Sequence, residues 1–168
     1  QNNEIKSISL SMNDSTRFDE SAQTVAFDKM VKNYCGFANR SNSYYHWCNL
    51  LIDNISKQNK REIKYGCLAY LQTASPPDFD VSNNLVPHIC HDRLQWADVN
   101  LKSAEIGNHY NWLDKSKSLG WYDYIYGSPY CVPRIYFSLM KKYLEWGCNN
   151  NVVSIWAEYN PIYIDGPK

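Results

Sequence analysis

The sequence lacks any long hydrophobic run, and it lacks an excess of charge of either sign. No stretch of about 18 apolar residues occurs, whereas a helix that crosses a membrane needs about 20. Residues 1–4 do not have the charged and then apolar plan of a signal peptide. Lys and Arg number 17 and Asp and Glu also number 17, so no long-range field attracts a polyanion. The sequence therefore predicts no membrane insertion and no nucleic-acid partner.

Metal-binding cysteine patterns are also missing. The chain has 6 cysteines, but their spacing contains no CxxC pair and no zinc-ribbon pattern. We therefore expect no metal site and no cofactor. Cys48, Cys67 and Cys148 fall within apolar patterns and are expected to be buried free thiols, while a disulfide involving Cys35 or Cys131 stays open.

Aromatic side chains, in contrast, are abundant. They make up 15% of the chain, mostly as 14 Tyr and 6 Trp. Such side chains combine a flat apolar face with a hydrogen-bonding group, which suits stacking against a sugar ring. They suit an ordinary hydrophobic core equally well, so both roles stay open for each of them.

The hydrophobic pattern predicts alternating strands and helices. Five short segments are typical of strands: residues 5–10, 63–71, 86–90, 119–126 and 152–157. Helical spacing predicts a helix over 44–55 capped by Ser43, a less regular one around 106–113, and one over 136–144 ended by Gly147. Residues 12–40 form a long loop after the first strand, with room for a short helix at 25–31. Strands that are apolar on both faces predict a mostly parallel sheet with crossover helices.

Polar residues stand where the predicted strands end, which is where parallel α/β folds place their ligand sites. These candidates are Asn13 with Asp14, Gln72 with Thr73, His88 with His91, Asp123, and Glu158. We do not expect a catalytic Cys90–His91 pair, because sequence neighbours on a strand point to opposite faces. His91 is instead expected to hydrogen-bond a hydroxyl or to shape the loop.

Side-chain alternation separates the two faces of the last strand. Ser154, Trp156 and Glu158 alternate with an all-apolar set that is expected to face the covering helices. Glu158 is therefore predicted to point inward, two residues beyond Trp156. Trp121 and Asp123 repeat this Trp-x-acid pattern in the preceding strand, so we expect both acids at one sugar site.

Two carboxylates on adjacent strands suit glycoside hydrolysis. One protonates the leaving oxygen and the other activates water or attacks directly, at a separation of about 5–10 Å. Strands spaced about 4.8 Å apart can supply that separation. The sequence thus predicts Asp123 and Glu158 as the paired carboxylates. The structural alternative is that Asp123 caps a turn or a helix and that Glu158 pairs with a nearby Lys or Arg.

The motifs follow one another in a fixed order along nearly the whole chain. They are residues 8–14 ending in Asn13-Asp14, residues 41–45, residues 68–77 with Pro76-Pro77, Cys90-His91, Trp112, residues 121–124, Gly147, and Ala157-Glu158. Their order and spacing resemble the glycoside-hydrolase-like barrel family catalogued as domain of unknown function 4838. The chain departs from that pattern in two places. Members of the family often carry a small cysteine cluster soon after the Asn-Asp motif, whereas here no cysteine follows Asn13-Asp14 until Cys35. In addition, Tyr159 replaces the usual glycine after Ala157-Glu158.

The resemblance implies an α/β fold of the (β/α) TIM-barrel type, of which residues 1–168 would form the later strands rather than all eight, as one partial domain. Its distant similarity to α-glucuronidases and β-hexosaminidases implies an oligosaccharide or polysaccharide ligand. Asp123 and Glu158 would be catalytic. The substrate-binding residues would be Asp14, Asn13, Thr73, His91, Trp121 and Trp156. The family also implies a secreted, cell-surface or periplasmic location.

The sequence is compatible with three functions: a glycosidase, a non-catalytic carbohydrate-binding domain, and a structural or assembly protein built on a barrel fragment. A complete barrel usually takes about 250 residues, and this chain has 168 and opens on Gln1. We therefore expect a processed product or a piece of a longer protein. The remainder of a parent chain or a partner subunit would complete its site.

Overall fold

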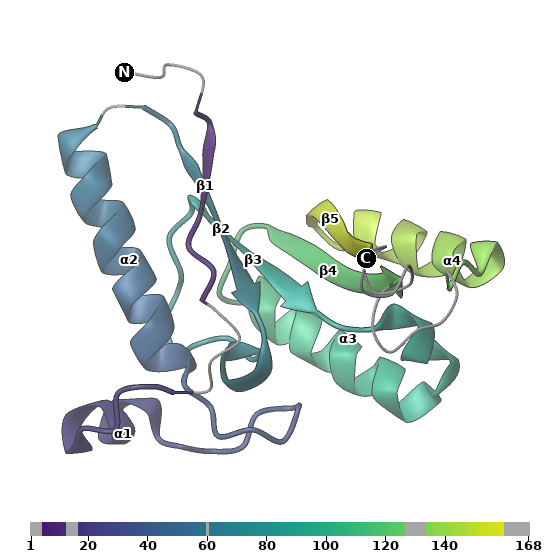
Figure 1. Cartoon of the computed structure of the whole chain (residues 1–168), viewed down its shortest axis with the longest axis horizontal. Helices are drawn as coiled ribbons and strands as arrows, with labels where there is room; N and C mark the ends of the chain where they lie inside the picture. The colour runs from purple at the N-terminus through teal and green to yellow at the C-terminus, as the bar shows by residue number, and fades with distance from the viewer. Residues whose placement is uncertain (1–4, 13–16, 60, 127–133, 160–168) are drawn as a thin grey trace, which may run out of the picture.

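Five parallel strands form one sheet in the computed structural model, which describes residues 5–12, 17–59, 61–126 and 134–159. The strands are β1 (Ser7–Ser9), β2 (Lys64–Ala69), β3 (Leu85–Cys90), β4 (Leu119–Tyr126) and β5 (Val152–Tyr159). They lie side by side in chain order, and the sheet curls into a half-barrel (Figure 1). The predicted parallel α/β sheet is confirmed, and the five strands fall at or within about two residues of the predicted segments.

In the described ranges four helices join the strands: α1 (Ala22–Asp28), α2 (Ser41–Gln58), α3 (Val99–Leu113) and α4 (Phe137–Cys148). Two short 3₁₀ turns, η1 (Leu71–Thr73) and η2 (Arg93–Ala97), follow β2 and β3. A parallel connection must cross from one end of the sheet to the other, which is what α2, α3 and α4 accomplish. Among the described helices, none has the length and hydrophobicity to cross a membrane.

The core lies between the sheet and these helices. Every second residue of each central strand points at the helices, so one face of the sheet is buried and the other is left open. The buried set includes Tyr65, Cys67 and Ala69 of β2, Leu85 and Ile89 of β3, and Leu119 and Trp121 of β4, packed with Tyr45, Cys48 and Ile52 of α2, Trp112 of α3 and Tyr143 of α4.

Helix α2 begins two residues before the predicted cap, at Ser41. Ser43 lies inside its first turn, where the backbone N–H groups have no partner within the helix. Asp28, at the end of α1, accepts from the backbone N of Ser43 at 2.8 Å and from its hydroxyl at 2.9 Å. Helix α2 is therefore capped by Asp28, which lies in the long segment before it. The local sequence pattern around Ser43 could not reveal this cap.

Gly147 does not end α4, as the sequence predicted, but lies within it. A Cβ on Gly147 would lie 2.8 Å from the Cζ3 and Cη2 atoms of Trp121, closer than real Cβ contacts come. Glycine is therefore required for packing against a strand rather than for a left-handed turn. The helix ends at Cys148, whose side chain is exposed and not buried as expected, because it lies on the solvent side of the last turn.

The other expected thiols agree with the structure. Cys48 and Cys67 are buried and free, and Cys35 is free as well. Cys131 lies outside the described residues, so a disulfide involving it is not tested.

Candidate functional site

The face of the sheet that the helices do not cover forms a cavity of about 570 Å³. Residues of both edge strands, β1 and β5, contribute to its wall, so the sheet curls around it. We call this the concave face. Ten residues that line the cavity define it: Ser7, Ser9, Lys64, Gly66, Leu68, Val86, His88, Tyr122, Ser154 and Trp156. We include Tyr124 and Glu158, which are paired in the ladder and lie on the same face of β4 and β5, two residues beyond Tyr122 and Trp156. Its volume falls within the range of about 300–1,000 Å³ that is typical of ligand sites.

The ladder places Trp156 and Glu158 on one face of β5, and Trp156 lines the cavity. The apolar set of β5 is not covered by the helices as predicted, because Val153 and Ile155 are 63% and 40% exposed on this edge strand. Trp156 is 65% exposed, which is high for the largest apolar side chain. Its partner across the ladder is Tyr122 of β4. The Tyr122 hydroxyl donates to Glu158 Oε2 at 3.3 Å. An indole plane, a phenol and a carboxylate therefore lie together near the carboxyl ends of β4 and β5.

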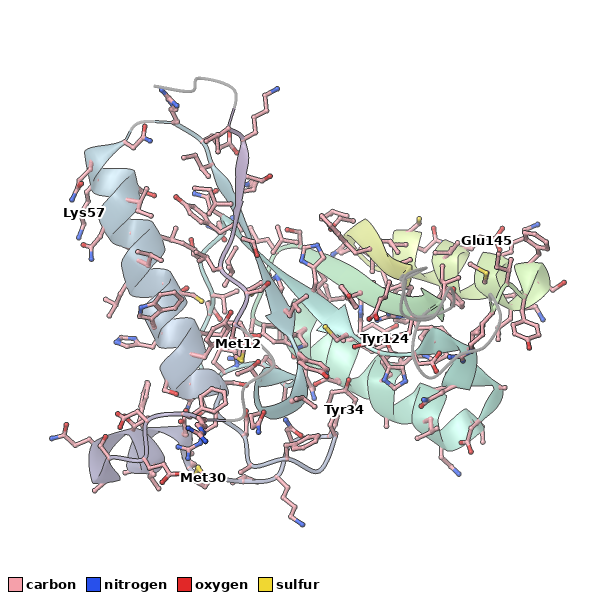
Figure 2. The ribbon with its side chains drawn as sticks, in the orientation of Figure 1. Met12, Met30, Tyr34, Lys57, Tyr124 and Glu145 are labelled. Carbon is pink, nitrogen blue, oxygen red and sulfur yellow. The ribbon has the colours of Figure 1, made fainter. Side chains whose placement is uncertain are left out.

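Tyr124 extends this group toward the end of β4 (Figure 2). Its ring meets that of Tyr122 edge to face at 5.4 Å between centroids. Burial, and then the nearby Cys90, raise the pKa of Tyr124 above its ordinary value, so its hydroxyl stays protonated and can donate. Burial also raises the pKa of Cys90 to about 12, so this thiol is not a nucleophile near neutral pH.

Asp123 does not face this group, and the prediction that it shares a site with Glu158 is wrong. In the ladder Asp123 pairs with Ala157, while Glu158 pairs with Tyr124. Adjacent residues on a strand point to opposite faces, so the two carboxylates lie on opposite sides of the sheet. Asp123 is 3% exposed and its Oδ1 accepts from the backbone N atoms of Arg93 (3.1 Å) and Tyr124 (2.8 Å). This carboxylate accepts from the first backbone N–H of η2, whose N-cap residue is Asp92, so Asp123 fits the structural alternative of a group that satisfies a turn.

Trp121 likewise faces the helices, so the prediction that it binds substrate is wrong. It is 1% exposed and stacks parallel to Trp146 of α4 at 6.0 Å between centroids. The guanidinium of Arg93 lies over its ring at 3.9 Å from the centroid. The repeated Trp-x-acid pattern thus has one copy on each face of the sheet, offset by one residue between the neighbouring strands.

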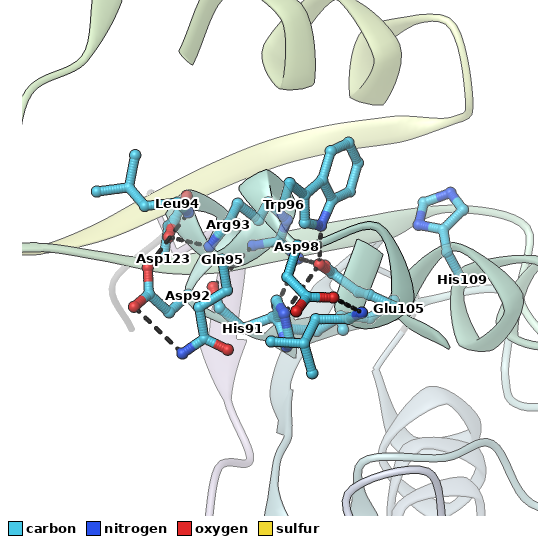
Figure 3. Close-up of polar contacts among 12 residues, drawn as sticks. His91, Asp92, Arg93, Leu94, Gln95, Trp96, Asp98, Glu105, His109 and Asp123 are labelled. Carbon is cyan, nitrogen blue, oxygen red and sulfur yellow. Dashed lines mark hydrogen bonds and ion pairs between the residues drawn. The ribbon is translucent and has the colours of Figure 1, made fainter. Parts of the chain in front are cut away.

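Arg93 and Glu105 form a buried ion pair beneath the ends of β3 and β4 (Figure 3). Their side chains are 0% and 2% exposed, and Arg93 Nη2 lies 2.6 Å from Glu105 Oε1. Arg93 also donates to the carbonyl oxygens of Ile89, His91 and Tyr122. Trp96 Nε1 donates to the second Glu105 oxygen. A buried charge pair needs this degree of satisfaction to be tolerated, so we interpret the group as structural.

His91 lies beside this ion pair and not on the concave face. Its Nε2 is 3.4 Å from Glu105 Oε2, and its side chain is 15% exposed. Burial lowers the pKa of His91, although the neighbouring Glu105 acts in the opposite direction. His91 therefore fits the second of its two predicted roles, shaping the loop after β3.

Thr73, which was also predicted to bind substrate, does not lie on the concave face. Thr73 is fully buried in η1, where its hydroxyl donates to the Tyr70 carbonyl at 3.0 Å and its own carbonyl accepts from Tyr45 at 3.1 Å. The prediction that Thr73 contacts substrate is therefore wrong in this structure. Asn13 and Asp14 lie outside the described residues.

Tyr122 is the functional candidate that sequence reasoning missed. The strand over residues 119–126 is aromatic on both faces, so alternation alone could not decide which set faces the helices. Gly120 could have indicated the answer, because a glycine inside a strand often marks the face on which another group approaches closely. In the structure that group is the imidazole of His88, which fixes the even-numbered residues of β4 on the concave face.

Within the described residues, no cluster of His, Cys, Asp or Glu has the arrangement of a metal site. Comparison of the chain with protein-family models, with curated proteins and with solved structures gives no match. The family resemblance and the location outside the cell that it implies therefore stay predictions.

Proposed function

We propose that the concave face binds a carbohydrate and that the chain is the later part of a glycoside-hydrolase-like barrel. The observation that carries this proposal is the exposed Trp156 plane, 65% exposed, beside the hydrogen-bonded pair of Tyr122 and Glu158. A sugar ring has apolar C–H faces and polar hydroxyl edges. A flat aromatic surface with a carboxylate and a phenol at its border suits both.

The position of this group in the fold supports the same proposal. Parallel α/β folds bind ligands at the carboxyl ends of their strands, and Glu158 is the penultimate residue of β5. The cavity extends from Ser154 and Trp156 of β5 across the sheet to Ser7 and Ser9 of β1 and to Ser11 just beyond it. The hydroxyls of these serines can both donate to and accept from sugar hydroxyls.

Binding is tested by titrating the chain with a panel of oligosaccharides and following amide chemical shifts. We expect shifts confined to residues of the concave face, largest in β4 and β5. We also expect Trp156→Ala to weaken binding by at least about tenfold, which is about 1.4 kcal/mol. Trp47 is the matched control, because it is 50% exposed on α2, away from the concave face. Equal binding by wild type and Trp156→Ala, or loss on Trp47→Ala alone, would contradict the proposal.

Glycoside hydrolysis is the second candidate, favoured by the contact between Tyr122 and Glu158. Because Asp123 lies on the other face, the two predicted carboxylates cannot act together on one glycosidic bond. We propose that in an active enzyme Glu158 would be the acid and base, held by the hydroxyl of Tyr122. Turnover of aryl glycosides should then fall by about 100-fold or more in Glu158→Gln. Unchanged turnover in that variant would exclude the assignment, while Asp123→Asn serves as a control for folding.

A further inference from the structure

The imidazole of His88 lies across the floor of the concave face. The ladder aligns Leu68, His88, Gly120 and Ser154 in one row over four strands. A Cβ on Gly120 would lie 2.1 Å from His88 Cδ2 and 2.4 Å from Nε2. On the other side, a Cβ on Gly66 would lie 3.5 Å from His88 Cε1. The ring therefore passes directly over Gly120, and no other residue at that position leaves room for it.

Across Gly120 the ring meets Ser154 of β5. The distance between His88 Nε2 and Ser154 Oγ is 2.8 Å. His88 Nδ1 lies 3.1 Å from the carbonyl oxygen of Val86. A carbonyl oxygen only accepts, so it assigns the ring proton to Nδ1 and leaves Nε2 as an acceptor. The Ser154 hydroxyl therefore donates to Nε2, which is the arrangement of a serine nucleophile with its base.

We propose that Ser154 is a nucleophile toward carboxylic esters and that His88 is its general base, with the Val86 carbonyl holding the reactive tautomer. Ser154 Oγ forms a bond to the ester carbonyl carbon as its proton passes to His88 Nε2. The tetrahedral adduct then breaks the bond to the alkoxy oxygen, which takes the proton from His88. Water repeats the two steps on the acyl-serine, releasing the carboxylic acid and restoring Ser154.

The cavity defines the class of ester. Leu68, Val86 and Val153 line it around the dyad, with the side chain of Trp156 beside Ser154 along β5. An apolar acyl chain fits these three side chains better than a charged one, because Leu68, Val86 and Val153 offer no partner to a desolvated charge. We therefore assign a carboxylic ester with a short apolar acyl group as the substrate class.

The environment keeps the base in its neutral form. Burial lowers the pKa of His88, so the imidazole carries no proton on Nε2 at neutral pH. The other titratable side chains that line the cavity are Lys64, Cys67 and Tyr122. Lys64 is engaged with Asn84 Oδ1 at 3.2 Å, and burial raises the pKa of the Cys67 thiol, which stays protonated. This activity goes beyond sugar binding and does not depend on it.

The test is covalent labelling of the chain with an alkyl fluorophosphonate, followed by peptide mass spectrometry. The serine oxygen displaces fluoride from phosphorus and His88 takes the serine proton. We expect one label per chain, on Ser154, in the wild-type protein. We also expect release of nitrophenol from p-nitrophenyl butyrate, lost in Ser154→Ala. His88→Gln, which has no base, should slow labelling by about 100-fold or more.

The matched control is Ser56→Ala. Ser56 is exposed on α2, away from the concave face and from His88, so this variant should label at the wild-type rate. Three results would overturn the proposal: no label on the wild-type chain, a label on Ser9 or elsewhere in place of Ser154, or equal labelling rates for His88→Gln and wild type. The first two of these results are read on the wild-type protein, so they do not depend on any variant folding.

Discussion

Replacing Gly120 by alanine should destabilise the fold, because the new methyl group would occupy the place of the His88 ring. Its Cβ would lie 2.1 Å from Cδ2, whereas ordinary contacts are 3.4–4 Å, so the imidazole must move by more than an ångström. Overpacking of this kind costs about 1–3 kcal/mol. Loss of the hydrogen bond to Ser154 adds about 1 kcal/mol. Alanine also has less backbone entropy than glycine in the unfolded chain, which stabilises the folded variant by about 0.5–1 kcal/mol. The net loss in the free energy of unfolding is therefore about 1–3 kcal/mol.

Urea unfolding followed by far-UV circular dichroism measures this cost, and two other glycines calibrate it. Gly107 lies inside α3 with nothing within 4 Å of its added Cβ, so Gly107→Ala should stabilise the protein by about 1 kcal/mol. At Gly66 the nearest atom is an ordinary 3.5 Å away, so Gly66→Ala should change stability by less than about 1 kcal/mol. The three substitutions should therefore rank in the order Gly107, Gly66 and Gly120, from stabilising to destabilising.

A double-mutant cycle isolates the contact. In a His88→Ala background the ring is gone, so adding Gly120→Ala should no longer destabilise the chain. If Gly120→Ala is as stable as Gly66→Ala, or if its cost persists without His88, the imidazole does not lie over residue 120 and the dyad is misplaced.

Three further predictions concern the helix-facing side of the sheet. Arg93→Met should cost about 3–5 kcal/mol in urea unfolding, because it leaves Glu105 buried and charged without its 2.6 Å partner, and a cost below 1 kcal/mol would contradict the buried pair. Gly147→Ala should cost about 1–3 kcal/mol through its contact with Trp121, and a stabilised variant would contradict that contact. Burial lowers the pKa of His109, whose Nε2 donates to the Asn150 carbonyl at 2.8 Å. The unfolded histidine therefore binds protons more readily than the folded one below about pH 6.5, so stability should be full above that pH and fall as the pH drops through the lowered value. Unfolding midpoints at pH 7.5 and 5.5 measure this difference, which should shrink in His109→Gln and would be refuted by equal midpoints in the wild type.

The fold could be predicted from the sequence because strand and helix periods are local properties. The segments over 119–126 and 44–55 are strongly patterned, and both form the expected elements. Helix α3 was less regular for a physical reason. Its buried face carries Glu105, Asn108 and His109 along with Trp112. Glu105 pairs with Arg93 in the preceding turn, while Asn108 and His109 find partners 34 and 41 positions away. No single-sequence pattern identifies a polar side chain that tertiary contacts will satisfy.

The site could be predicted only in part, since it depends on register between strands. Alternation placed Glu158 and Trp156 on one face of β5, and the structure agrees. It could not show that β4 pairs Asp123 with Ala157, and a shift of one residue moves every side chain of a strand to the other face. The contact between His88 and Ser154 spans 66 positions and crosses a strand between them, so no local motif reveals it.

We propose that ligands bind on the concave face, beside Trp156 and Glu158. A crystal structure of the chain soaked with an oligosaccharide mixture would show this binding. We expect a sugar ring stacked on Trp156 with a hydroxyl within about 3 Å of Glu158 or Tyr122. A ring bound on the helix-facing side near Asp123, or on an outer helix surface with the concave face empty, would contradict it.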